Sequence, residues 1–140
     1  MEYVPLYEAK LFDGFNPRHG DFRLVPEESK YGVKAQPMKP DQSQLASKDW
    51  SPHPRYWIPL SFVSDWRLRR QDKSDSYGRV ATRLICRGLV ESRTLKAAVL
   101  PSNIALGNSG NFWLSPDMNG EYPWVLTTVL NSLVLDFQAR

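Results

Sequence analysis

The chain has 140 residues, of which 41% are hydrophobic and 24% are charged. This composition is typical of a folded globular domain and excludes a disordered chain, and the length suits a single hydrophobic core. No stretch approaches the roughly 18 consecutive apolar residues of a membrane-spanning helix, and no basic-then-apolar leader opens the chain. The lone Cys86 cannot form an internal disulfide. We therefore expect one cytoplasmic domain over residues 1–140, with no membrane partner.

Positive charge is concentrated in the middle of the sequence. The net charge is only +3, but residues 65–96 hold nine Lys and Arg against four Asp and Glu, a balance of +5. Residues 1–64 balance at eight against eight, and residues 97–140 carry one against three. Clustered cations of this kind suit the phosphate backbone of a nucleic acid, although a solvated surface gives the same count.

The first half of the sequence predicts few regular elements. Residues 1–24 read as an opening strand followed by a loop at "DGFNPRHG". Residues 25–55 are rich in proline and lack periodicity, which indicates a long loop. The stretch "SFVSDWRLRR" is predicted to form a short helix that begins at Ser61.

The second half predicts strands and then a helix. In residues 79–89, "RVATRLICRGL", alternation would divide a strand into a core face containing Cys86 and a basic face containing Arg79, Arg83 and Arg87. "TLKAAVLP" is expected to return as its partner, and "SNIALGNSGNFWLSP" to form a strand broken by a loop.

The end of the chain predicts a helix. From Pro123 onward, apolar residues recur every three or four positions as far as Phe137, which predicts one amphipathic helix with an apolar stripe. We therefore expect an α+β fold, a mostly antiparallel twisted β-sheet with short flanking helices and a C-terminal amphipathic helix.

Catalytic patterns are scarce in this sequence. Dinucleotide, phosphate-loop and HExxH motifs are absent, and His19 and His53 lie in separate proline-containing segments. Glu8 and Lys10 form the E-x-K half of a metal-dependent nuclease signature, but the preceding Asp is missing. We expect no catalytic residue, no metal site and no cofactor in this chain.

Four segments carry a family resemblance: "PLYEAKLFDGFNPR", "PRYWIPLSFV", "RLICRGLVESRTLKAAVLP" and "LNSLVLDFQAR". In this order they resemble the C-terminal region of large adenine-specific DNA methyltransferases, which include fused restriction–modification enzymes and phage-defence methyltransferases. The match leaves the Pro-rich segment uncovered. The chain departs from the family where members often have "RDI" in place of Arg83-Leu84-Ile85, and an acidic residue in place of Val90.

The resemblance implies a target-recognition domain, which reads the DNA sequence and does not catalyse methylation by itself. The family's Asn-Pro-Pro-aromatic signature and glycine-rich cofactor loop are missing here, so S-adenosylmethionine is expected only in the parent enzyme. The family also continues beyond the last helix into a glycine-rich stretch. The resemblance therefore implies a fragment of a longer chain, with double-stranded DNA and the parent's methyltransferase domain as partners.

Residue type and location suggest the contacts to DNA. The basic segment around residues 67–73 would contact phosphates, and Arg, Lys and Asn further along could pair with base edges. Arg93 lies in a turn motif shared by enzymes with different targets, which favours a structural role. The candidate DNA-binding residues are Arg67, Arg69, Arg70, Lys73, Arg83, Arg87, Arg93, Lys96, Asn108 and Asn111.

Two other functions stay open at this point. The chain could be a protein-interaction module that docks a partner through the apolar face of the last helix and an aromatic group of Trp50, Tyr56 and Trp57. It could also be a small metal-dependent nuclease that uses Glu8 and Lys10. Salt separates DNA binding from apolar docking, because only the former weakens steeply as salt rises.

Overall fold

The computed structural model describes residues 1–70, 79–83, 93–113 and 121–139, and it describes the backbone alone at 66–70 and 79–83. Six strands within these ranges form two three-stranded sheets. The first has the order β2-β1-β5, where β1 is Tyr3–Tyr7, β2 is Tyr56–Pro59 and β5 is Ala105–Leu106. The second has the order β4-β3-β6, formed by Ala97–Leu100, Arg79–Arg83 and Gly110–Trp113.

Strand pairing is antiparallel throughout except between β1 and β5, which are parallel. The predicted α+β class with mainly antiparallel strands is therefore confirmed. The expected return of "TLKAAVLP" is confirmed as well, because β4 pairs with β3 and places Ala97 opposite Thr82. The strand expected at residues 102–116 is broken into β5 and β6 by the turn at 107–109, also as predicted.

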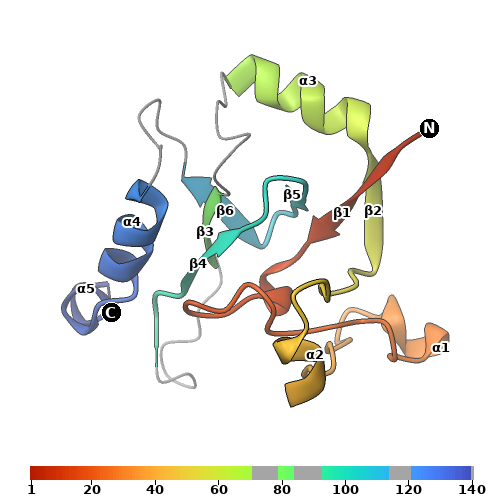
Figure 1. Ribbon diagram of the computed structural model, residues 1–140, viewed down its shortest axis with the longest axis horizontal. Helices are drawn as coiled ribbons and strands as arrows, with labels where there is room; N and C mark the ends of the chain where they lie inside the picture. The colour runs from red at the N-terminus through yellow and green to blue at the C-terminus, as the bar shows by residue number, and fades with distance from the viewer. Residues whose placement is uncertain (71–78, 84–92, 114–120, 140) are drawn as a thin grey trace.

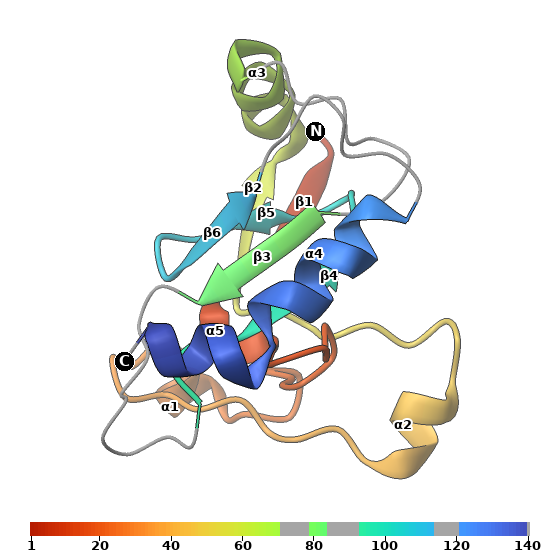
Figure 2. The same cartoon turned by 90° about the vertical axis from the view of Figure 1, so that its left-hand side faces the viewer.

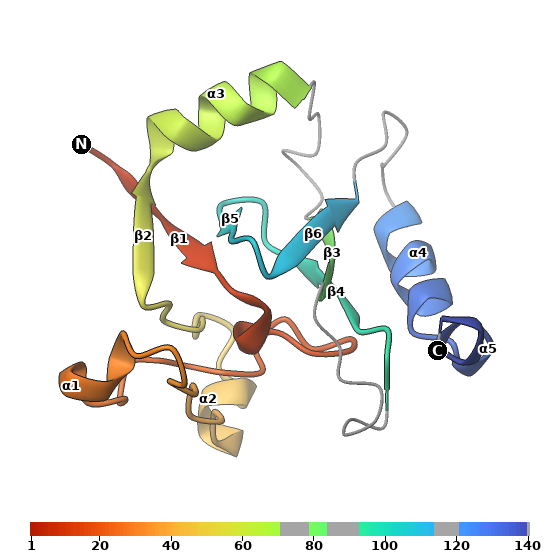
Figure 3. The same cartoon turned by 180° about the vertical axis from the view of Figure 1, so that it is seen from behind.

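The helices lie around the two sheets, as Figures 1 and 3 show. Helix α3, Leu60–Arg70, packs on the first sheet through Val63, which contacts Val4 and Ala105. On the other side of the molecule, α4, Tyr122–Leu130, and α5, Leu133–Gln138, cover β4.

Strand β4 is buried on both faces because its side chains alternate between two clusters. Ala98 and Leu100 join the largest core cluster together with the aromatic rings of Phe12 and Phe22. Ala97 joins the cluster under α4 and α5. A strand with helices on one face and core on the other reads as a continuous apolar run, which explains the sequence "AAVL".

The two faces expected of β3 stay a prediction, because the side chains of Arg79–Arg83 are not among those described. The neighbours on β4 do not separate the two sets, since Ala81 pairs with the fully buried Ala98 and Thr82 pairs with the fully buried Ala97. The predicted continuation of this strand beyond Arg83, including Cys86, lies outside the described residues.

The Pro-rich segment 25–55 is more structured than the expected loop. It holds two short helices, α1 at Glu27–Lys30 and α2 at Gln42–Ala46. Helix α2 begins with a capping box, because Asp41 accepts a hydrogen bond from the Gln44 N–H at 2.8 Å and Gln44 accepts one from Asp41. The sequence analysis did not predict this helix, because the proline-rich composition of the segment indicated a loop.

Two arginines hold this segment in place, Arg18 from outside it and Arg55 from within it. The Arg18 guanidinium donates to the carbonyls of Leu45, Ser47 and Trp50 at 2.9, 2.9 and 3.3 Å. Arg55 donates to the carbonyls at positions 30 and 32. Arginine suits this task because its five donors form a rigid fork.

The single C-terminal helix predicted from periodicity is wrong, because the chain breaks at Asn131 and Ser132 into α4 and α5. Asn131 ends α4, and the Ser132 hydroxyl accepts the Leu135 N–H at 3.2 Å, which starts α5. The apolar spacing continues through Asn131 and Ser132, so it did not predict the break between the two helices. The predicted start near Pro123 is confirmed, since this residue lies in the first turn of α4.

Candidate nucleic-acid interface

Register brings four of the predicted DNA-binding residues to one end of the second sheet. Arg83 ends β3 and pairs with Gly110, the first residue of β6. Asn111 is the next residue of β6, Asn108 lies in the turn just before it, and both are exposed. Lys96 comes directly before Ala97, the first residue of β4. Ala97 and Asn111 lie on either side of Thr82 in the sheet, so Lys96 lies at the same end of the sheet as Asn111. Figure 2 shows the end of β3 on the same side as the start of β6.

The other predicted contacts divide into two groups. Arg67, Arg69 and Arg70 lie in the last turn of α3, and their side chains are not among those described. Lys73 and Arg87 lie outside the described residues, so their predicted roles stay predictions. Arg93 is described, and its side chain is largely engaged within the protein.

Arg93 links the segment before β4 to the C-terminal helices. Its Nη2 donates to the carbonyl of Asn131, and its Nε lies 3.4 Å from a carboxylate oxygen of Asp136. The other Asp136 oxygen accepts the N–H groups of Thr94 and Leu95 at 2.6 and 2.7 Å. The carboxylate is only 5% exposed, so this ion pair holds the two segments together in a largely buried position. This geometry gives Arg93 a structural task.

The Asn131 side chain bonds to the outer edge of β4 in the way that a neighbouring strand would. Its side-chain oxygen accepts the Ala97 N–H at 3.0 Å, and its side-chain nitrogen donates to the Ala97 carbonyl at 2.8 Å. These are the two bonds that a paired strand residue would make. The same nitrogen also donates to the Thr127 carbonyl at 2.9 Å. Sequence reasoning missed both Asn131 and Asp136, although "LNSLVLDFQAR" was singled out as a motif.

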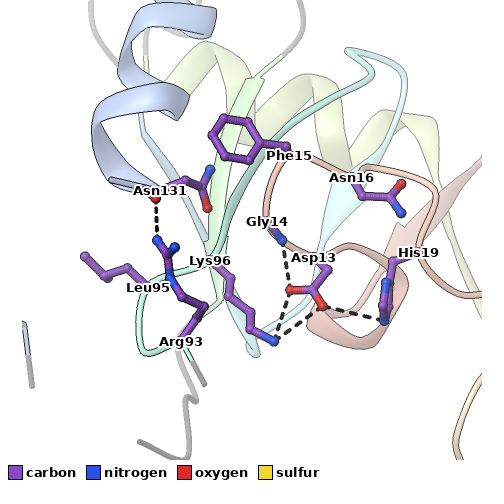
Figure 4. Close-up of a pocket in the computed structure, with 9 residues that line it drawn as sticks. All are labelled: Asp13, Gly14, Phe15, Asn16, His19, Arg93, Leu95, Lys96 and Asn131. Atoms are coloured by element: carbon purple, nitrogen blue, oxygen red, sulfur yellow. Dashed lines mark hydrogen bonds and ion pairs between the residues drawn. The ribbon is translucent and has the colours of Figure 1, made fainter. Parts of the chain in front are cut away.

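A charged cluster forms where the turn of residues 13–16 meets the start of β4. Lys96 Nζ lies 3.1 Å from one Asp13 carboxylate oxygen and 3.3 Å from the other, and His19 Nε2 lies 3.7 Å from the second. Figure 4 shows these side chains directed toward one another. The Lys96 side chain is 14% exposed, so its charge is partly removed from water.

This cluster lines a pocket of about 360 Å³. The pocket lies between the turn of residues 13–16, the segment leading into β4 and the end of α4 (Figure 4). Its walls carry two amides, an imidazole, an ammonium, a guanidinium and an aromatic ring, with Asp13 as the one carboxylate. The sequence-predicted residues Arg93 and Lys96 therefore share one pocket wall with residues that sequence reasoning left unassigned.

The Asp13 carboxyl gives the cluster a defined pH dependence. Burial raises its pKa, but the Gly14 N–H and the Lys96 ammonium more than offset this, so the pKa lies below its usual value of 3.8. A depressed folded-state pKa means that the ion pair stabilises the fold above pH 3.8 and that this stabilisation is lost as the pH falls further. We expect Asp13→Asn to flatten the acid limb of a plot of urea midpoint against pH. An unchanged acid limb would contradict the assignment.

The nuclease reading is not favoured by the surroundings of Glu8 and Lys10. Both Glu8 carboxylate oxygens accept from Arg55 at 2.7 Å, in a two-pronged ion pair whose side chains are 18% and 8% exposed. Lys10 donates to the carbonyl of Ala35 at 2.6 Å. Across the described ranges, no group of three His, Cys, Asp or Glu residues is placed to hold a metal ion.

The predicted aromatic group does not form one cluster. Tyr56 and Trp57 are neighbours on β2 and so point to opposite faces of the strand. Tyr56 lies against Tyr31, with ring centroids 5.8 Å apart, and Trp57 lies against His53 at 5.5 Å. A docking surface made of Trp50, Tyr56 and Trp57 together is therefore not supported.

None of the helices in the described parts of the chain has the length and apolar character needed to cross a membrane. Comparison with protein-family models, curated proteins and solved structures gave no significant match to this chain. The resemblance to methyltransferase recognition regions therefore stays a prediction.

Proposed function

We propose that this chain is the DNA sequence-recognition domain of an adenine-N6 DNA methyltransferase or restriction–modification enzyme, non-catalytic by itself. The observation that carries the proposal is the gathering of Arg83, Lys96, Asn108 and Asn111 at one end of the β4-β3-β6 sheet. These residues come from two strands, the segment just before β4 and one turn, and no local pattern would place them together.

The major groove of DNA admits a two-stranded β-ribbon. At this end of the sheet, β3 and β6 form an antiparallel pair of that kind, and Asn108 lies in the turn that leads into β6. Asn108 and Asn111 have the amide groups that pair with adenine, and Arg83 has the guanidinium that pairs with guanine. Lys96 contributes positive charge toward the phosphates.

The contacts between the two most specific resembling segments also support the proposal. Arg93, Thr94 and Leu95 of "ESRTLKAAVLP" are bound by Asn131 and Asp136 of "LNSLVLDFQAR". Because the two segments form one structural unit, their joint presence in the sequence has a physical reason. The parent enzyme would add the methyltransferase domain and S-adenosylmethionine, so an Asn-Pro-Pro-aromatic motif is expected upstream in the native gene.

Binding to duplex DNA tests this function. We expect the chain to bind a pool of random duplexes with an affinity that falls steeply between low and physiological salt. Selection from the pool should enrich a defined sequence. The double variant Asn108→Ala/Asn111→Ala should lose about 1–3 kcal/mol of discrimination at each contacted base pair, while non-specific affinity changes little.

Asn103→Ala is the matched control. This residue is an exposed asparagine that follows β4, at the end of the sheet where Leu100 pairs with Arg79, and so lies away from Arg83. Its substitution should leave the enriched sequence and the affinity unchanged. Salt-independent binding, or equal effects of the two asparagine changes, would contradict the proposal.

A second function is favoured by the exposed apolar face of α4 and α5. Five apolar residues of these two helices are more than half exposed, and a cluster of exposed apolar side chains is typical of an interaction site. They are Val125 at 57%, Val129 at 51%, Leu133 at 73%, Val134 at 72% and Phe137 at 81%. As a protein-interaction module, the chain would bind its partner with little dependence on salt, and Phe137→Ser would weaken that binding.

A further inference from the structure

Phe15 is held in a backbone conformation that a phenylalanine adopts only at a cost. Its φ angle is 60°, in the left-handed region, and it is the only non-glycine residue with positive φ in the described part of the chain. The turn is fixed by the Phe15 N–H, which donates to the Ala97 carbonyl at 2.8 Å, and by two bonds between Asp13 and Asn16. Turn chemistry would favour glycine or asparagine at this position.

Packing within the chain does not offset this strain. The Phe15 residue is 60% exposed, so its ring gains little from burial. Figure 4 shows the ring at the rim of the pocket, above Gly14 and beside Asn131. Strained residues that the core does not explain occur preferentially where a ligand binds.

The pocket below this ring offers polar groups of the kinds that a nucleotide needs. Lys96, His19 and Arg93 bring nitrogen donors to the pocket, against the single carboxylate of Asp13. Asn16 uses its side-chain oxygen to accept the Arg18 N–H at 2.9 Å, which orients its amide group. A phosphate suits the cationic groups, and a base suits the aromatic ring and the amide.

We propose that this pocket binds one unpaired nucleotide of a nucleic acid strand, with the base stacked on Phe15 and the phosphate near Lys96, His19 and Arg93. The proposal rests on the proposed function in taking DNA as the source of the nucleotide. It adds a site beside the sheet end, since Lys96 lies directly before β4, whose first residue pairs with Thr82, the neighbour of Arg83. The phosphate would share Lys96 with Asp13, so binding weakens as the salt concentration rises.

Titration of the intact chain with free ligands, followed by amide chemical shifts, tests this site. Nucleoside 5′-monophosphates should shift the signals of Gly14, Asn16 and Lys96. The same nucleosides without phosphate, and inorganic phosphate without a base, should each bind more weakly. Phe15→Gly should reduce affinity for the monophosphates by roughly tenfold or more, as expected for a lost base–aromatic stack, and leave inorganic phosphate unaffected.

The control is Phe62→Ala, which removes a phenylalanine that is 73% exposed on α3, away from the pocket. It should not change nucleotide affinity. Phe15→Gly should also raise the urea midpoint, because glycine relieves the left-handed strain. A variant that is more stable and yet binds less identifies a binding role, since a structural residue would change stability in the opposite direction.

Several results would overturn the proposal. These are shifts centred elsewhere, equal affinity for inorganic phosphate and the monophosphates, or nucleotide binding that survives Phe15→Gly. Failure of this site is distinguishable from failure of the proposed function, because duplex selection with the Asn108 and Asn111 variants does not depend on Phe15. If the chain selects a defined duplex sequence but does not bind free nucleotides, the proposed function stands and only the nucleotide pocket is contradicted.

Discussion

Replacing Asp136 with alanine is expected to lower the free energy of unfolding by about 3–5 kcal/mol, the usual cost of removing one partner from a buried ion pair. The change leaves the N–H groups of Thr94 and Leu95 without an acceptor and removes the carboxylate beside Arg93. Because the free energy of unfolding of a domain this size is itself about 5–15 kcal/mol, the variant should be marginally folded. Urea denaturation followed by tryptophan fluorescence measures the loss.

Two further variants make this prediction specific. Asp136→Asn keeps one oxygen acceptor for the backbone N–H groups and removes the charge, so its cost should lie between those of wild type and Asp136→Ala. Asp49→Ala removes an exposed carboxylate from the Pro-rich segment and should cost less than about 0.5 kcal/mol. If Asp136→Ala costs no more than Asp49→Ala, the buried pair does not hold the segment before β4.

Replacing Glu8 with alanine is the second change expected to have a large effect, again about 3–5 kcal/mol. It would leave the Arg55 guanidinium, whose side chain is 8% exposed, without its carboxylate partner. Arg55 also lies over the ring of Phe22, with 5.1 Å between the guanidinium carbon and the ring centroid, so the disturbance would reach the main core. Thermal and urea unfolding both measure this loss.

The control for Glu8 is an exposed glutamate. Glu28→Ala removes an exposed carboxylate from α1 and should cost less than about 0.5 kcal/mol. The double change Glu8→Leu/Arg55→Met replaces the buried pair with apolar groups and should recover part of the stability lost in Glu8→Ala. Equal costs for Glu8→Ala and Glu28→Ala would contradict the structural role of Glu8.

The Glu8 result also bears on the nuclease alternative. Loss of a cleavage activity in Glu8→Ala would not identify a metal ligand, because the same change removes the partner of Arg55. Lys10→Met is the better test, since Lys10 contributes a single bond to the Ala35 carbonyl. Metal-dependent cleavage that disappears in a folded Lys10→Met variant would revive the nuclease hypothesis.

Sequence alone was sufficient where local pattern decides the structure. The pairing of β3 with β4, the break between β5 and β6 and the start of α4 all follow from alternation, turn residues and proline placement. It failed at the break between α4 and α5, because that break depends on Asn131 and its bonds to Ala97, 34 positions earlier. Apolar periodicity contains no information about such long-range bonds.

The candidate site shows the same division. Residue type was enough to select Arg83, Lys96, Asn108 and Asn111, but their gathering at one end of a sheet depends on strand order, which the sequence did not provide. The pocket was missed because its turn reads as an ordinary "DGFN" loop. The feature that distinguishes this turn from an ordinary loop is the positive φ angle of Phe15, which only the three-dimensional structure reveals.

The side-chain pairing of Asn131 with Ala97 also occupies backbone groups that the outer edge of β4 would otherwise offer to another strand. An open sheet edge is a template on which strands of other molecules can add, and proteins usually block such edges with charges, prolines or bulges. Here the outer edge of β4 is closed at its first residue by an amide group and by the Phe15 N–H. An incoming strand would have to displace both before it could form a ladder. The helix break at Asn131 therefore places an amide group where a neighbouring strand would otherwise pair with Ala97.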